Sequence, residues 1–186
     1  MRTTLLATFA FTALPMLALA APWTVDPAAS TLSFTGKQAG EAFTGSFTKF
    51  TPVVEFDPLK PENAKITVTV DMASATIDDK DKQESLPTSD WFDTAKYATA
   101  TFTSTRVTSL SSQQGAYVAE GDLTLHGITK PVALKFTFAE TNGKATVDGS
   151  VVLQRNDFGI GSGQWKSDEW IAYPVDVKFH LLATKG

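Results

Sequence analysis

The chain has 186 residues, a formal net charge of −4 and no cysteine. Its mildly acidic balance gives no electrostatic reason to expect binding to nucleic acid or to anionic lipid headgroups. The absence of thiols excludes disulfides, thiolate metal sites, thiol catalysis and a lipid-modified N-terminal cysteine.

The first twenty residues have the pattern of a secretory signal peptide. Arg2 supplies a positive start, a nearly uncharged apolar run follows, and Ala18-Leu19-Ala20 matches an A-x-A cleavage site. A membrane anchor is the alternative, but Pro15 interrupts the run and no charged stop-transfer flank follows it. We therefore predict a signal peptide over residues 1–20, export to a bacterial periplasm, and a secreted chain without stable membrane insertion.

Strand-like segments follow one another along residues 21–186, which we expect to form one domain. In each segment apolar and polar residues alternate with a period of two, so that one face of the strand can enter a core. The predicted strands lie around residues 23–25, 32–34, 43–47, 54–56, 64–72, 100–107, 123–138, 145–153 and 175–181.

Residues 123–138, which read LTLHGITKPVALKFTF, predict a hairpin. The alternation is interrupted over residues 126–130, which favours a short turn containing Gly127. Pro131 fits the start of the second strand, where a residue without an N–H group is tolerated. Asn142-Gly143 predicts another tight hairpin turn, of the primed type.

Residues 78–97 break the strand pattern. The charged stretch from Asp79 to Ser85 can form one or two helical turns, and Ser89 can cap a short turn after it. The fold class is therefore all-β with one or two short helices.

About eight antiparallel strands with one apolar face require either a closed barrel or a two-sheet sandwich. Gly45, Gly121 and Gly149 interrupt the strand faces at points where bends or close packing are expected. These glycines favour an eight-stranded barrel, which can enclose one small ligand.

Few residues have the arrangement that catalysis or metal binding requires. His126 lies in the predicted turn and His180 on the polar side of the last strand, and neither belongs to a metal-ligand spacing. Residues 78–81 resemble part of a calcium loop but lack its glycine and terminal glutamate. No nucleophile elbow or nucleotide-binding loop is present. We therefore expect no enzyme activity, no metal and no cofactor.

Aromatic residues are abundant, with thirteen phenylalanines, four tryptophans and three tyrosines. Most must pack in a core, but a subset can line a tunnel for a long apolar ligand. Trp91, Phe92 and Phe158 lie outside regular strands and are candidates for a lid or rim. Arg155 is the one cation expected to face an interior polar group, and an ion pair with Asp157 or another acid is the alternative. The predicted ligand-binding residues are Phe34, Phe47, Val68, Val70, Trp91, Phe92, Phe102, Leu125, Leu134, Phe136, Arg155, Phe158 and Trp165.

Four motifs in the same order resemble the YceI-like family. They are LTLHGITKPV at residues 123–132, FTGSF with FDP at 43–58, DWFD with Tyr97 and ATF at 90–102, and RNDFG at 155–159. The resemblance implies a lipocalin-like antiparallel barrel in the periplasm that holds a polyisoprenoid lipid or an isoprenoid quinone in a long tunnel. It also implies that no catalytic residues are established.

Three hypotheses about function follow. The first is a binding protein that sequesters or carries a polyprenyl lipid or isoprenoid quinone inside the barrel. The second is a structural or interaction module whose core is filled. The third is an enzyme acting on a lipid or quinone through Arg155, Asp157 and His126. The identity of the ligand and the oligomeric state stay open.

Overall fold

The computed structural model describes residues 22–186, and the predicted signal peptide lies outside the described residues. The strands are β1 (Pro22–Val25), β2 (Thr31–Gln38), β3 (Glu41–Phe47), β4 (Phe50–Glu55), β5 (Lys65–Asp71), β6 (Ala75–Ile77), β7 (Thr99–Ser109), β8 (Ala116–Leu125), β9 (Ile128–Thr141), β10 (Lys144–Gln154) and β11 (Pro174–Lys185). The helix α1 spans Lys80–Ser85, and short 3-10 turns lie at Pro61–Asn63, Met72–Ser74, Arg155–Phe158 and Gly163–Trp165.

Eight strands close a ring in the order β1-β4-β5-β7-β8-β9-β10-β11, and β1 returns to β11. The strand β11 pairs with two strands, β1 and β2, along the same edge. Near its C-terminus Ala183 pairs with Val25 of β1, and further back His180 pairs with Thr31 of β2. From β2 the sheet continues to β3 and β6. The predicted eight-stranded antiparallel barrel is confirmed, and β2, β3 and β6 extend its wall beyond β1.

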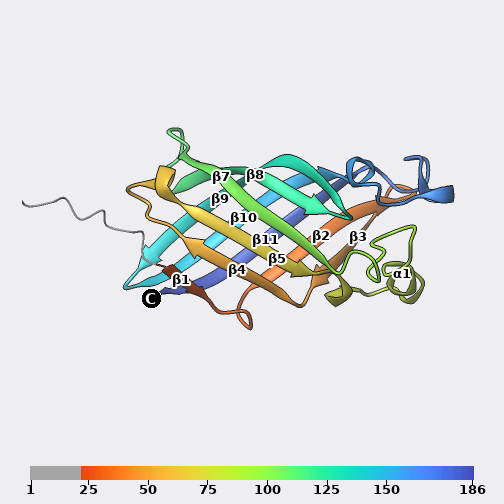
Figure 1. Ribbon diagram of the computed structural model, residues 1–186, viewed down its shortest axis with the longest axis horizontal. Coiled ribbons are helices and arrows are strands. Elements are labelled where there is room, and N and C mark those ends of the chain that lie inside the picture. The colour runs from red at the N-terminus through yellow and green to blue at the C-terminus, as the bar shows by residue number, and fades with distance from the viewer. Residues whose placement is uncertain (1–21) are drawn as a thin grey trace, which may run out of the picture.

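The barrel is elongated, and its two ends differ (Figure 1). One end carries β1 and the C-terminus, where regular strands meet. The other end carries α1 and the irregular segments of residues 78–97 and 155–173. We call these two ends the floor and the mouth.

Three hairpins turn through a pair of residues with positive φ, namely Ala39-Gly40, His126-Gly127 and Asn142-Gly143. Such left-handed pairs are typical of tight type I′ turns, whose twist matches that of the strands. The turn predicted at Asn142-Gly143 is confirmed, because the residues on either side of it pair directly.

The turn at His126-Gly127 is shorter than the predicted interruption over residues 126–130. Leu125 pairs directly with Ile128, so β9 begins three residues before Pro131. Pro131 is tolerated inside the strand because β10 pairs with β9 only over residues 135–141, which leaves one side of β9 unpaired at the proline.

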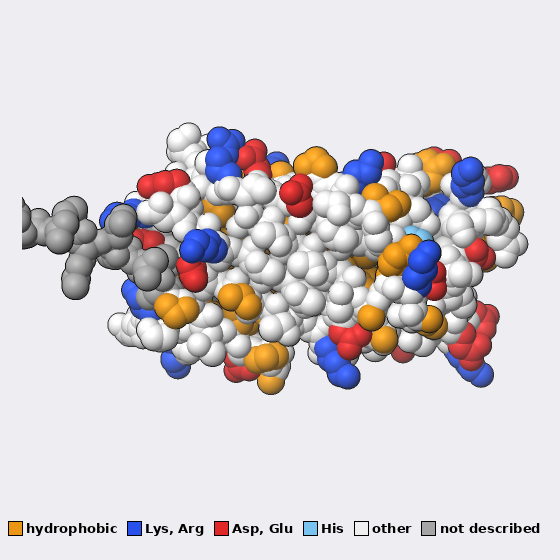
Figure 2. Space-filling model, in the orientation of Figure 1, with side chains coloured by type: hydrophobic (Ala, Val, Ile, Leu, Met, Phe, Trp, Pro, Cys, Tyr) orange, Lys and Arg blue, Asp and Glu red, His pale blue; other side chains and the backbone are white. Residues whose placement is uncertain are grey.

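The outer face of the barrel is polar. Hydroxyl groups bond across neighbouring strands, as between Thr35 and Thr44 at 2.9 Å and between Thr124 and Thr129 at 2.8 Å. On the face shown in Figure 2, hydrophobic side chains are scattered among charged residues of both signs. The alternation of the sequence thus separates a hydroxyl-rich exterior from an apolar interior.

Phenylalanine rings cover the glycines of the inner wall. Phe179 pairs in register with Gly149, and Phe34 pairs with Gly45. A Cβ atom on either glycine would overlap the facing ring. The close packing predicted at these glycines is therefore confirmed, and the rings lie along the wall where no side chain competes for space.

We predict that Gly149→Ala destabilises the barrel. The added methyl group would overlap the Phe179 ring and lie 2.7 Å from the carbonyl oxygen of Lys135. Such overpacking costs about 1–3 kcal/mol of unfolding free energy, which urea denaturation measures. Ser150→Ala, at the neighbouring exposed position, is the control, and equal unfolding midpoints for the two variants would contradict the close packing.

Candidate functional site

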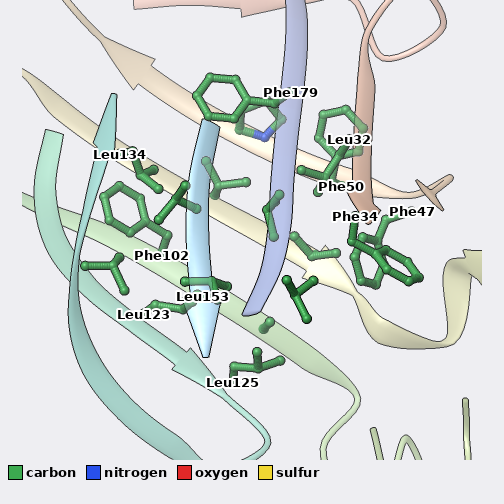
Figure 3. A pocket seen from close by; sticks show the side chains of 18 of the residues that line it. Leu32, Phe34, Phe47, Phe50, Phe102, Leu123, Leu125, Leu134, Leu153 and Phe179 are labelled. Carbon is green, nitrogen blue, oxygen red and sulfur yellow. The ribbon is translucent and has the colours of Figure 1, made fainter. Parts of the chain in front are cut away.

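The interior of the barrel holds a cavity of about 260 Å³. Side chains from strands on opposite sides, such as Phe102 and Phe179, point into it (Figure 3). A core packed at ordinary density leaves few voids larger than a water molecule, so this interior is not filled. Among the described residues that line the cavity, Arg155 carries the one charged side chain.

Aromatic rings close the floor end of the cavity. The indole Nε1 of Trp23 donates a hydrogen bond of 2.9 Å to the carbonyl oxygen of Phe56. The Phe138 ring meets the rings of Trp23 and Phe56 edge to face, with centroids 5.3 and 4.9 Å away. Phe136 stands beside Phe56 at 5.8 Å. We call Trp23, Phe56, Phe136 and Phe138 the aromatic floor.

Irregular segments cover the mouth end. Trp91 and Phe92 of residues 78–97, and Phe158 of residues 155–173, line the cavity there. The Phe92 ring packs against Phe34 and Phe47 from the barrel wall, with centroids 6.4 and 6.0 Å away. Apolar side chains from the two segments therefore complete the enclosure that the strands leave open.

Asp90 joins the two segments of the mouth. Its carbonyl oxygen accepts hydrogen bonds from the N–H groups of Gly161 and Ser162, at 2.7 and 2.9 Å. Its carboxylate accepts a bond of 2.6 Å from the Ser162 hydroxyl. Beside this junction the rings of Trp91 and Trp165 lie 6.1 Å apart. We call the Asp90–Gly161–Ser162 contacts the Asp90 latch.

Arg155 is almost fully buried, with 4% of its surface exposed, and each of its five N–H donors meets a backbone carbonyl oxygen. The accepting oxygens lie 2.7–3.3 Å away and belong to Ile160, Gly161, Ser167, Ile171 and Ala172. Burial lowers the pKa of this guanidinium from its ordinary value. The side chain therefore organises the segment of residues 155–173 from within.

The predicted ion pair of Arg155 is wrong. The ion pairs of the described residues do not include Arg155, and the side chain of Asp157 is exposed. An irregular loop leaves carbonyl oxygens without strand partners, and a buried guanidinium supplies five donors in a fixed plane to satisfy them.

The predicted ligand-binding residues are brought together, with one exception. Those that line the cavity are Phe34, Phe47, Val68, Val70, Trp91, Phe92, Phe102, Leu125, Leu134, Phe136, Arg155 and Phe158. Trp165 does not line it and packs against Trp91 instead. Contact of these residues with a ligand stays a prediction.

The lining also contains residues that were not proposed, including Trp23, Phe56 and Leu86. Trp23 and Phe56 lie on predicted strands, but alternation marks only the inward face and not the end of the barrel. Leu86 follows α1 in the irregular segment, where no periodic signal marks the residue that turns inward.

His126 fastens the β8–β9 turn to the mouth. Its Nδ1 lies 3.0 Å from the carbonyl oxygen of Phe158 and must carry the hydrogen, because a carbonyl can only accept. Its ring packs edge-on against Tyr97, with centroids 4.7 Å apart. Nε2 is buried, and it is the one buried side-chain polar atom among residues 22–186 that lacks a hydrogen-bond partner.

His180 lies on the outer wall, where its Nδ1 stands 2.7 Å from the carboxylate of Asp148. Within residues 22–186, no group of three or more histidine, aspartate or glutamate side chains has a geometry that could hold a metal ion. No helix of this part of the chain combines the length and apolar character needed to cross a bilayer.

Comparison with known domains decides the family. Residues 23–183 match the YceI-like domain, which covers nearly all of the barrel. The chain belongs to the YceI-like family. Among curated relatives, a UPF0312 protein of Pseudomonas savastanoi pv. phaseolicola is 38% identical over 125 residues, which make up 62% of each chain. The match thus spans somewhat less than two thirds of that relative.

Solved structures share the YceI-like fold. BcnA of Burkholderia cenocepacia is 35% identical and superposes with a TM-score of 0.82, over 87% of this chain and 100% of BcnA. A polyisoprenoid binding domain from Saccharophagus degradans is 16% identical, with a TM-score of 0.70 over 90% of this chain and 99% of that domain. At that identity the second likeness supports the fold alone.

We predict that Arg155→Met loosens the mouth of this YceI-like barrel. Removing the guanidinium leaves five carbonyl oxygens without donors, which lowers the unfolding free energy by about 3 kcal/mol or more. Hydrogen exchange of residues 160–172 should accelerate most. Arg106→Met is the matched control, because among the described residues that exposed side chain forms its ion pair and side-chain hydrogen bond with Glu120 alone, and its loss should matter far less.

Proposed function

We propose that this YceI-like protein binds a long apolar isoprenoid lipid, either a polyprenyl chain or an isoprenoid quinone, and sequesters or carries it in the periplasm. The observation that carries the proposal is the unfilled apolar cavity between the mouth and the aromatic floor. The fold shared with a polyisoprenoid binding domain supports the choice of ligand class.

Burial of the lipid tail supplies the binding free energy. Each square ångström of apolar surface removed from water contributes about 25 cal/mol, and no covalent step is needed. The lining residues are almost all aliphatic or aromatic, which suits an isoprenoid chain with its repeated methyl branches. A filled structural module is disfavoured by the open interior.

The chemistry of the lining favours binding over catalysis. Arg155 has no free N–H donor, and Asp157 is exposed and absent from the lining. His126 lies in the β8–β9 turn and is not among the lining residues. The three residues considered for an enzyme therefore do not converge on a shared point in the tunnel.

The periplasmic location is supported by the N-terminal sequence pattern and by the absence of cysteine. A chain exported through its signal peptide would meet lipid outside the cytoplasm. Fractionation of cells expressing the full chain tests this, and retention of uncleaved protein in the cytoplasm would contradict it.

We expect lipid extraction and mass spectrometry of the purified protein to find an isoprenoid. Leu134→Trp should reduce uptake of an added isoprenoid quinone or prenol by at least about tenfold, because the indole occupies the lumen. Ala133→Trp, at the neighbouring exposed position, should leave uptake unchanged. Absence of bound lipid, together with no uptake by the unaltered chain, would refute the proposal.

Loading through the mouth predicts that the Asp90 latch controls lipid exchange. Because the chain has no cysteine, Asp90→Cys with Ser162→Cys creates a single reducible link between the two segments. The oxidised protein should take up and release lipid much more slowly, and a reductant should restore both rates. Thr35→Cys with Thr44→Cys links two strands of the wall as a control. Equal rates in both oxidised proteins would place loading elsewhere.

A further inference from the structure

We infer that the aromatic floor measures the length of the bound chain, so that Phe138 and the small residues beside it determine which isoprenoid fits. The inference rests on the proposed lipid binding and adds a specificity that the lining alone does not imply. Three features carry it: the rigidity of the floor, the seal of the barrel behind it, and the placement of polar groups at the opposite end.

The rings of the floor hold one another in place. Phe56 stands edge-on to Phe138 at 4.9 Å and to Tyr117 at 5.0 Å, and its carbonyl oxygen is bonded to the indole of Trp23. Tyr117 stacks on Phe136 at 5.4 Å from outside the cavity. Because each ring is packed against at least one other, none can turn aside without losing these contacts.

The barrel wall is sealed at this end. Trp23 pairs in register with Val54 of β4 on one side and with Lys185 of β11 on the other. The ammonium group of Lys185 lies 5.9 Å from the centre of the Trp23 ring. Val107, behind the floor, has no exposed surface. A chain tip that reaches the floor therefore meets hydrogen-bonded strands and not an opening.

Polar groups decide which end of the ligand points to the floor. At the floor the indole N–H of Trp23 is already bonded, so a headgroup there would lose water without gaining a partner. The mouth segment of residues 155–173 carries exposed polar residues, among them Gln164, Lys166 and Asp168, so a headgroup at that end keeps its contact with water. The headgroup therefore stays at the mouth and the tail points to the floor.

With both ends assigned, the tunnel has a fixed length. A chain that is too long leaves isoprene units in water at the mouth, and a chain that is too short leaves a void above the floor. Each case forfeits apolar burial or contact. The preferred ligand is the one whose tip reaches the aromatic floor while its headgroup reaches the mouth.

Substitution of two alanines can change the position of the floor along the tunnel. Ala145 and Ala183 face each other across β10 and β11, line the cavity and are 2% and 6% exposed. A leucine at either position would shorten the tunnel, whereas Phe138→Leu would lengthen it. Ala100, 6% exposed and lining the cavity at the start of β7 near the mouth, provides a matched control.

The test is a competition among all-trans prenols that differ by single isoprene units. The delipidated protein and its variants are incubated with an equimolar mixture, and the bound prenols are extracted and identified by mass spectrometry. Circular dichroism checks that each variant is folded. Ala145→Leu and Ala183→Leu should shift the preferred length downward, and Phe138→Leu should shift it upward. The ratio of neighbouring lengths should change by roughly tenfold.

Ala100→Leu should lower uptake of every prenol without changing the preferred length. Unchanged distributions in the folded floor variants would overturn the inference while leaving lipid binding intact. A shift caused by Ala100→Leu and absent from the floor variants would place the measuring end at the mouth and also overturn it. Failure of the unaltered protein to bind any prenol would refute the proposed function itself, and the inference with it.

Discussion

The interior of the barrel is lined by bulky apolar side chains, and it stays open because phenylalanine rings among them lie against glycines in the neighbouring strands. Around a closed barrel every second residue points inward, and large residues at all of these positions would meet at the axis and fill it. Gly45 under Phe34 and Gly149 under Phe179 provide the missing volume at the wall. The lumen therefore depends on the register of the strands as much as on their composition. A shift of a strand by one residue would turn its rings outward, and the apolar lining would be lost.

The two ends of the barrel are closed by different interactions. At the floor, regular strands satisfy their own backbone groups, so aromatic side chains are enough to fill the end. At the mouth, the chain leaves the sheet, and its carbonyl oxygens need donors from elsewhere. Arg155 supplies these from a single side chain, which explains why a buried cation persists without a counter-ion among residues 22–186.

The sequence predicts which face of each strand points inward, but it does not predict which atoms a side chain outside the strands contacts. Alternation correctly assigns the inward side of nearly every strand, and the Asn142-Gly143 turn follows from local backbone chemistry. The bonds of Arg155 could not be predicted, because its acceptors are backbone atoms that any residue type would present. Trp165 does not line the cavity, which the sequence could not show for a related reason: outside a periodic segment, nothing in the sequence distinguishes an aromatic residue that points inward from one that packs outside.

This difference between the ends also bears on how the molecule can change shape. Opening the floor would break strand pairing of β1 with both β4 and β11 and separate interlocked rings. Separating the two mouth segments at their junction requires loss of the three hydrogen bonds of the Asp90 latch and the Trp91–Trp165 contact. Local opening follows the path of lowest free energy, so motion concentrates at the mouth while the floor keeps its position. A barrel with one yielding end and one fixed end can both exchange a long ligand and discriminate its length, whereas a barrel that yielded at both ends could only exchange it.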